Sequence, residues 1–426
     1  MKKGLLLFLF SFTLFQLSAQ FVEVAYGPGY TQQLFYSLST QESVMLDDAS
    51  WDIAFTAQGL QDAGIFLNEA ASSDENDAAL ELYLVPDKSY EQAITEDDLG
   101  ERLFNDEQGW QYGAFNMMRT ESNPFDYGWG TYNPAAMAVE GTQLFALKLR
   151  DGSFRKLEIT ALDGTTYEVR HAAFDGSGEV AFSVNKADHQ DTGLVFYSLT
   201  NNEVAADVPS TDDWDLLFTR YSTPLDDGEG GTLNYLLTGT LSGLGVEVAQ
   251  ADGVDPASVQ YDAYADSLQT ALDVIGYDWK SFDLTTFSWA LPLDRVYFVK
   301  TAEGKVYQLR FVDFEGSSTG VAVFEQTDLG ITNAVAESAI VNDFTVFPNP
   351  VQSRATVGLT LEQASRARLQ IHSAAGQRVW AAEAQFPAGF QVKELDLSHL
   401  PGGTYYLSIQ PEGSRPVSIP LIVAPQ

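Results

Sequence analysis

The sequence contains no cysteine. A chain without cysteine has no disulfide, no thiolate metal cluster and no cysteine nucleophile, so its stability must come from packing. Basic residues are also scarce, because 23 Lys and Arg stand against 59 Asp and Glu, for a formal net charge of -36. Such a surface repels phosphate backbones and anionic headgroups, which excludes nucleic acid as a partner. We interpret the acidity as a solvated surface; scattered divalent-cation sites are the alternative.

Only one long apolar run is present, and it lies at the N-terminus. Lys2 and Lys3 precede the run Leu5–Leu17, and the small residues Ser18-Ala19 follow it. This pattern predicts a cleavable secretory signal peptide over residues 1–19, with Gln20 as the new N-terminus. The run is shorter than a bilayer-spanning helix. We therefore expect a mature chain without a transmembrane segment, located outside the cell or on its outer surface.

Catalytic motifs are missing as well. The chain has no G-x-S-x-G, H-E-x-x-H or Walker sequence, and no carboxylate pair can be singled out among its acidic residues. We therefore predict that it is not an enzyme. With 45% hydrophobic residues in 426, the chain can bury the cores of two or three globular domains.

A repeated pattern organises the first three quarters of the chain. Residues 34–38 (LFYSL) and 51–56 (WDIAFT) return as 195–199 (VFYSL) and 214–219 (WDLLFT). Two further pairs follow in the same order: the strand–acidic-Gly–strand patterns of 144–157 and 296–309, and the segments 174–182 and 314–323. An acidic-Gly pair between two short apolar runs is a hairpin signal.

We therefore predict an all-β protein with two tandem, mostly antiparallel copies of one domain, at residues 20–188 and 189–330. Helix is expected to be minor, with Asp255–Ile275 as its best candidate. Residues 331–344 are small and polar and are predicted to be a linker. From Thr345 onward the charge is nearly balanced, so the negative charge lies in the two copies.

Residues 345–426 show a third pattern of short alternating strands. They open on Phe347-Pro348-Asn349-Pro350, contain Gly376-Gln377-Arg378-Val379 in the middle, and close on Leu400-Pro401-Gly402-Gly403-Thr404-Tyr405-Tyr406-Leu407. This series resembles the type A C-terminal sorting domain of the Bacteroidetes type IX secretion system. The resemblance implies a small immunoglobulin-like β-sandwich read by the secretion machinery, with Pro348, Asn349, Pro350, Gly402 and Gly403 as its signal. The chain lacks the terminal basic residue of many members; an ordinary adhesive sandwich is the alternative.

The repeated pattern resembles the HmuY-like family of Bacteroidetes haem-binding proteins. The shared phrase is aromatic-Tyr-Ser-Leu, then Trp-Asp, then an aromatic strand with an acidic-Gly turn; residues 189–330 add Arg220-Tyr221 and a glycine cluster. The resemblance implies a surface-located binding protein with haem or another porphyrin as ligand. We expect Trp51 and Trp214 to be core residues.

Haem needs axial ligands, normally His or Met, beside an apolar slot. Residues 189–330 hold no methionine, and their one histidine, His189, sits in the polar connection, so the first copy is the expected site. Met117, Met118 and Met137 lie in an aromatic-rich stretch, and His171 follows a strand. Met118 with Met137 is the thioether pair that we favour, although methionine also fills gaps in aromatic cores.

A second hypothesis needs no axial ligand. Trp129, Tyr127 and Tyr132 could form an aromatic platform for a glycan or a protein partner. The function predicted from the sequence is therefore non-catalytic binding outside the cell, of a porphyrin or, alternatively, of a glycan or protein.

Overall fold

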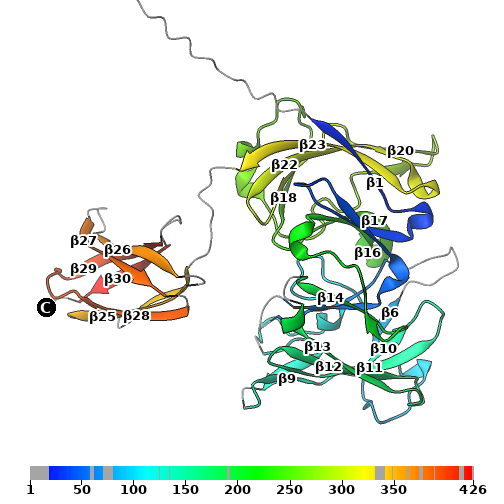
Figure 1. Ribbon diagram of the computed structural model, residues 1–426, viewed down its shortest axis with the longest axis horizontal. Coiled ribbons are helices and arrows are strands. Elements are labelled where there is room, and N and C mark those ends of the chain that lie inside the picture. The colour runs from blue at the N-terminus through cyan, green and yellow to red at the C-terminus, as the bar shows by residue number, and fades with distance from the viewer. Residues whose placement is uncertain are drawn as a thin grey trace, which may run out of the picture. The chain divides into compact units, whose positions relative to one another are not determined.

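The computed structural model describes residues 19–57, 62–70, 80–123, 125–133, 135–189, 192–331, 341–347, 349–361, 364–373, 378–387, 389–411 and 417–424. The predicted signal peptide, apart from Ala19, lies outside these residues, as do Pro348, Gly376, Gln377 and most of the predicted linker. The chain divides into two compact units, which end and begin at Gly330 and Ile331. Both consist of antiparallel sheets (Figure 1). Strands account for 51% of the chain, and the helical segments of the described residues are short 3-10 turns.

Residues 48–208, which we call the inserted body, form a contiguous part of the first unit. One of its two sheets has the order β15-β14-β4-β5; the other has the order β13-β12-β11-β10-β6-β7, with β9 on β11 and β8 on β9. The strands are β4 Ile53–Thr56, β5 Ile65–Leu67, β6 Glu81–Leu84, β7 Arg102–Leu103, β8 Gly130–Asn133, β9 Ala138–Gly141, β10 Phe145–Lys148, β11 Phe154–Asp163, β12 Thr166–Ala172, β13 Val180–Asn185, β14 Leu194–Ser198 and β15 Glu203–Val204.

The split body joins residues 20–47 to residues 209–331. Its sheets have the orders β1-β23-β22-β21-β18 and β17-β16-β2-β3, and β19 pairs with β20. The strands are β1 Gln20–Ala25, β2 Gln32–Tyr36, β3 Ser43–Asp47, β16 Leu216–Asp226, β17 Thr232–Ser242, β18 Glu247–Ala251, β19 Ser281–Asp283, β20 Ser288–Ala290, β21 Val296–Lys300, β22 Lys305–Phe314 and β23 Val321–Ile331.

Corresponding strands occupy corresponding places in the two bodies. The order β13-β12-β11-β10-β6 matches β1-β23-β22-β21-β18, and β15-β14-β4-β5 matches β3-β2-β16-β17. The register agrees too, since Ile53 faces Tyr197 where Leu216 faces Tyr36. The hairpins predicted within 144–157 and 296–309 are confirmed as β10–β11 and β21–β22.

The sheets do not divide at the predicted copy boundary of 188/189. β1 pairs with β23 and β2 with β16, so the N-terminal strands complete the body built by the C-terminal half (Figure 1). β14 pairs with β4 instead of with the β16 that follows it in the chain. Each predicted copy therefore contributes its first hairpin to the other body's sheet.

Each body has its own apolar core, and a third cluster joins them. One face of β4 and β14 packs inside the inserted body, and the matching face of β2 and β16 packs inside the split body. The alternating residues on the opposite faces meet between the bodies, as strand geometry requires. The buried members of this joining cluster are Phe35, Leu46, Trp51, Ala54, Phe66, Leu194, Phe196, Trp214, Leu217, Tyr221, Leu241 and Leu272. Trp51 and Trp214 are thus core residues, as predicted.

The helix predicted over Asp255–Ile275 is wrong. The segment has only two 3-10 turns, η7 Tyr261–Ala263 and η8 Ala265–Ser267. Val248 and Gln269 exchange two backbone hydrogen bonds of 2.9 Å, which hold the chain extended against β18. The rings of Tyr261 and Tyr264 both pack against Phe298 on β21. Tertiary packing therefore overrides local helix propensity in this segment.

The second unit is a sandwich of two sheets. Their orders are β24-β25-β28 and β27-β26-β29-β30, around one buried apolar cluster. The strands are β24 Val341–Phe347, β25 Arg354–Leu361, β26 Ser365–Ser373, β27 Arg378–Phe386, β28 Gly389–Asp396, β29 Gly403–Pro411 and β30 Val417–Val423. β24 begins inside the predicted linker of 331–344.

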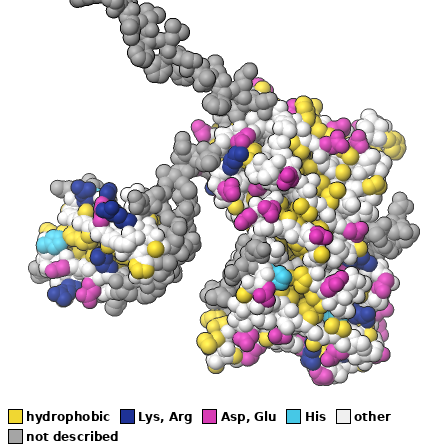
Figure 2. All heavy atoms as spheres, in the orientation of Figure 1, with side chains coloured by type: hydrophobic (Ala, Val, Ile, Leu, Met, Phe, Trp, Pro, Cys, Tyr) yellow, Lys and Arg dark blue, Asp and Glu magenta, His cyan; other side chains and the backbone are white. Residues whose placement is uncertain are grey.

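Acidic side chains are scattered over the visible face of the first unit and do not gather in one patch (Figure 2). Within the described residues, no three His, Asp or Glu side chains form a group that could hold a metal ion. No helix in the described part of the chain is long and apolar enough to cross a membrane.

Candidate functional site

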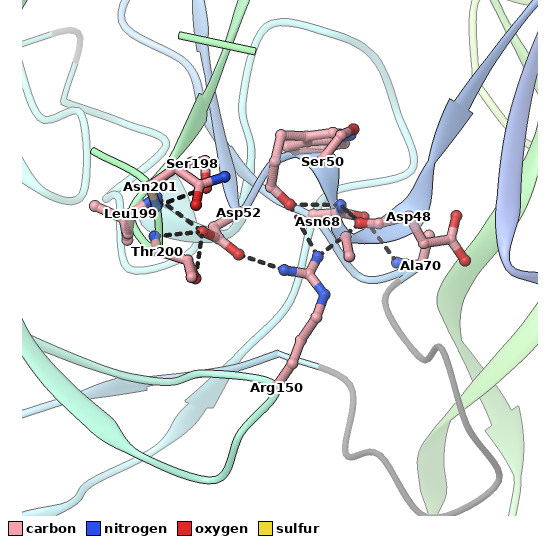
Figure 3. Close-up of polar contacts among 12 residues, drawn as sticks. Asp48, Ser50, Asp52, Asn68, Ala70, Arg150, Ser198, Leu199, Thr200 and Asn201 are labelled. Atoms are coloured by element: carbon pink, nitrogen blue, oxygen red, sulfur yellow. Dashed lines mark hydrogen bonds and ion pairs between the residues drawn. The ribbon is translucent and has the colours of Figure 1, made fainter. Parts of the chain in front are cut away.

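The Trp-Asp motif of the inserted body forms a buried junction. Asp52, at the start of β4, is 1% exposed and accepts hydrogen bonds from the Leu199 and Thr200 amides, at 2.8 and 3.2 Å (Figure 3). Its other carboxylate oxygen accepts from the Arg150 guanidinium. Arg150 also donates to the carbonyls of Asp48 and Trp51, at 2.7 and 2.9 Å. These hydrogen bonds lock the β10–β11 turn to β4 and β14.

The matching aspartate of the split body lacks this arginine. Asp215 accepts from the Leu38 amide at 2.8 Å, as Asp52 accepts from Leu199. The position that matches Arg150 in the β21–β22 turn is Ala302. Burial therefore raises the pKa of Asp215 to about 6. The two motifs share a backbone role and differ in how the buried charge is neutralised.

A small apolar cavity of about 60 Å³ lies in the joining cluster between the bodies. Glu69 lines it, is 6% exposed, and accepts from the Asn105 and Ser222 amides at 3.0 and 3.2 Å. Burial outweighs these bonds and raises the pKa of Glu69 to about 7. Ligand sites usually enclose about 300–1,000 Å³. A porphyrin does not fit this cavity.

The three methionines predicted as haem ligands are on the surface. Met117 and Met118 follow the 3-10 turn η4 (Ala114–Asn116) and are 46% and 38% exposed. Met137 is 73% exposed in the β8–β9 turn, at a φ of 56°. The Met117 sulfur accepts from the Phe104 amide at 3.5 Å. The thioethers of Met118 and Met137 therefore remain available to a ligand.

Two other predicted site residues are corrected by their burial. His171 is 2% exposed, and its Nε2 contacts the Asn202 side chain at 2.9 Å. Trp129 is fully buried, and its indole donates to the Ala63 carbonyl at 2.9 Å. Neither side chain presents a face or an atom to an external ligand, because β12 and the loop that leads into β8 place them in the packed interior.

The other platform residues are half-buried. Tyr132 stacks on the exposed Phe125, with ring centroids 5.9 Å apart. Tyr127 lines a cleft of about 430 Å³ together with Tyr112, Gln111 and Arg119. The predicted platform is thus divided between a surface stack and a cleft.

The sorting-signal residues that the structure describes hold the last strand of the sandwich. Asn349 donates to the Pro420 carbonyl at 3.0 Å and accepts from the Ile422 amide at 2.8 Å. Pro350 follows directly, and Val351 donates to the Ile422 carbonyl at 2.8 Å. Gly402 and Gly403 lead into β29, beside β30. Residues about seventy positions apart therefore build one edge.

Sequence reasoning missed Arg150 and the cleft residues Tyr112, Gln111 and Arg119. Arg150 had a signal, because the two aligned acidic-Gly turns differ there by arginine against alanine. The cleft had none, since it depends on how three loops of the inserted body meet.

Residues 345–423 match the family described as the secretion system C-terminal sorting domain, and residues 190–325 match the HmuY protein family. The chain therefore carries a type IX sorting domain and a HmuY domain, and the sorting domain directs it to the cell surface or into the medium. The prediction that residues 20–188 form a second HmuY copy stays a prediction.

No curated protein matches the chain. The crystal structure of dimeric latent PorU from Porphyromonas gingivalis aligns at 12% identity over 91% of this chain and 36% of that one. This chain thus spans about a third of that protein, and the TM-score of 0.19 carries no argument about fold or function.

Proposed function

We propose that the mature protein is a non-catalytic binding protein that captures a porphyrin such as haem on the inserted body. The observation that carries the proposal is the exposure of Met118 and Met137 in loops that also present Phe125. Methionine is usually buried, so exposed thioethers beside an exposed aromatic ring need a reason other than core packing. Thioether sulfur is an axial ligand that haem iron accepts. The HmuY match over residues 190–325 supports a porphyrin as the ligand of the protein, and the exposed methionines are our reason for placing it on the inserted body.

Residues 209–331 of the split body contribute no ligand of this type, and the one methionine of residues 20–47, Met45, lies on β3, away from these loops in the sequence. Residues 190–331 contain neither methionine nor histidine. Its β19–β20 turn carries Phe287 where the β8–β9 turn carries Met137, at a similar φ of 51° and with 78% exposure. The two turns therefore project different chemistry from similar positions, and only the turn of the inserted body can ligate iron.

The test is a titration of haemin into the purified mature protein, followed through the Soret band in the ferric and ferrous states. We expect a red-shifted band that Met118→Ala and Met137→Ala each weaken by at least about tenfold in affinity. Met45→Ala is the matched control, because Met45 is 54% exposed on β3 of the split body. An unchanged Soret band would reject the porphyrin as the ligand. Haemin binding that neither Met118→Ala nor Met137→Ala weakens would reject the thioethers as the axial ligands.

A further inference from the structure

Two adjoining clefts open on the first unit, and the second borders the joining cluster at Leu272. One is the cleft of about 430 Å³ beside Tyr112 and Tyr127, and its neighbour has a volume of about 340 Å³. Asp62 and Gln111 line both. Together they have the size of a site for an extended small ligand, while each alone holds only part of one.

The second cleft is formed by both bodies. The inserted body contributes Thr56, Gln108, Gly109, Trp110 and Gly193, and the split body contributes Gly243, Leu244, Gly245, Val246, Thr270 and Leu272. Trp110 anchors this wall, because its indole donates to the Ser242 carbonyl at 2.9 Å. The interlocked hairpins thus fix the width of the cleft.

The lining offers hydrogen-bonding groups that no described residue engages. Among the described residues, nothing pairs with the hydroxyls of Tyr112 and Tyr127 or with the side-chain amides of Gln108 and Gln111. Hydroxyl and amide groups both donate and accept, which is what a ligand covered with hydroxyl groups requires. The tyrosine rings add apolar faces for C–H groups.

The charges of the first cleft are already paired. Asp126 accepts from the Thr120 and Gly128 amides, both at 2.9 Å. Arg119 lies 3.6 Å from Glu121 and covers the Tyr112 ring at 4.0 Å. Asp62, the third acidic residue of the lining, also has a partner within the fold. Because the charged side chains among the described lining residues are all engaged, the lining favours a neutral ligand.

We propose that the adjoining clefts bind a short neutral oligosaccharide, with Tyr127 and Gln111 as central contacts. The saccharide would lie from the Tyr112–Tyr127 end to the Gly109–Gly245 end and would contact both bodies. This site uses neither Met118 nor Met137, so it stands or falls independently of the porphyrin proposal.

The experiment screens the mature protein against an array of neutral gluco-, manno- and xylo-oligosaccharides of two to six units, then measures the best binder by titration calorimetry. We expect Tyr127→Ala and Gln111→Ala each to weaken binding by about tenfold or more. Gly109→Phe is expected to block the second cleft. A Cβ at Gly109 meets no atom within 4 Å, so the larger side chain enters open space.

Tyr132→Ala is the matched control, because Tyr132 belongs to the same loop region but stacks on Phe125 outside the clefts. It should leave saccharide binding unchanged. The proposal is overturned if no neutral saccharide binds, if Tyr127→Ala and Gly109→Phe bind normally, or if a lysine oligomer binds in the clefts and the saccharides do not. The haemin titration of Tyr127→Ala, Gln111→Ala and Gly109→Phe should be unaffected, which separates failure of this site from failure of the porphyrin site.

Discussion

Arg150 and Asp52 show how one residue decides the cost of a buried charge. Arg150 is 14% exposed and Asp52 1%, and Arg150 is the charged partner of that carboxylate. Removing one partner of a buried ion pair leaves the other charge uncompensated, whereas exposed pairs contribute little. The stability of the inserted body therefore depends on Arg150 far more than on its surface ion pairs.

We expect Arg150→Met to lower the free energy of unfolding by roughly 3 kcal/mol, because it leaves the buried Asp52 carboxylate without its charged partner. The Asp48 and Trp51 carbonyls lose one donor each and keep the Asn68 side-chain amide as the other. Urea denaturation at neutral pH measures this loss. Lys300→Met is the control: Lys300 pairs with Glu247, and both side chains are about a third exposed. Its loss should cost under about 1 kcal/mol. Equal losses in the two variants would contradict a buried-charge role for Arg150.

Glu69 makes the joint between the bodies sensitive to pH. Its folded-state pKa, about 7, exceeds its ordinary value of 4.5 because of burial. The folded protein therefore favours the neutral acid, and this contribution is complete below about pH 4.5 and is lost as the pH rises to about 7. The loss amounts to roughly 3 kcal/mol.

Glu69→Gln should reduce the slope of unfolding free energy against pH between about 4.5 and 7, since glutamine does not titrate there. Part of the slope should remain, because burial also raises the pKa of Asp48 to about 8, of Glu107 to about 7 and of Asp215 to about 6. Urea titrations at several pH values compare the variant with the parent protein, and Glu121→Gln is the control, since Glu121 is 86% exposed. A slope that is as steep in Glu69→Gln as in the parent protein would assign the whole pH dependence to the other buried acids.

Single residues were predicted well where a local pattern fixes their place. The alternating apolar residues after Trp51 and Trp214 give the buried faces of β4 and β16, and the acidic-Gly pairs give the turns after β10 and β21. The burial of Trp129 and His171 could not be read this way. His171 lies on β12, whose inward face is set by β11 and β13. Trp129 lies in the loop before β8, where its indole meets the Ala63 carbonyl, 66 positions away in the sequence.

At the scale of elements, local signals were enough for hairpins and failed for the long connection. A hairpin closes over a few residues, so its turn chemistry decides it. The segment Asp255–Ile275 has helix-like spacing, but its backbone bonds to β18 and its side chains cover β21. Neither contact can be predicted from the sequence of the segment itself, because β18 precedes the segment and β21 follows it.

The β24–β30 sandwich was predictable for a related reason. Its motif residues meet directly, with Asn349 bonded across to Pro420 and Ile422. A fixed edge of this kind constrains the residue types at both ends of the module. The motif therefore specifies the sandwich that it holds together, which explains why the pattern of about eighty residues was enough to predict this domain.

At the scale of the whole molecule, the sequence repeat and the folded bodies have different boundaries. The repeat starts at the aromatic-Tyr-Ser-Leu strand, whereas each body starts at the Trp-Asp strand. The two sets of boundaries are reconciled because β1 pairs with β23 and β2 with β16, which places β1–β3 in the split body. No local pattern could reveal this, because a strand pairs equally well with either copy of a repeated partner.

This closure predicts which fragments fold. Residues 48–208 contain both strand partners of every internal ladder of the inserted body and its whole core cluster. Residues 20–188 leave β1–β3 without β16 and β23, and leave β4 without β14. We therefore expect residues 48–208 to show cooperative thermal unfolding and dispersed amide resonances, and residues 20–188 and 189–330 to show neither.

The 48–208 fragment will also expose the face that joins the bodies, including Trp51, Phe66 and Phe196. An apolar face of this kind favours self-association, so sedimentation should show dimers or larger species, in contrast to the full unit. Adding residues 20–47 to residues 209–331 should restore the split body, because β1–β3 then regain β16 and β23 as partners. Cooperative folding of 20–188 and of 189–330, with 48–208 unfolded, would mean that the sequence repeat, and not the closed body, is the folding unit.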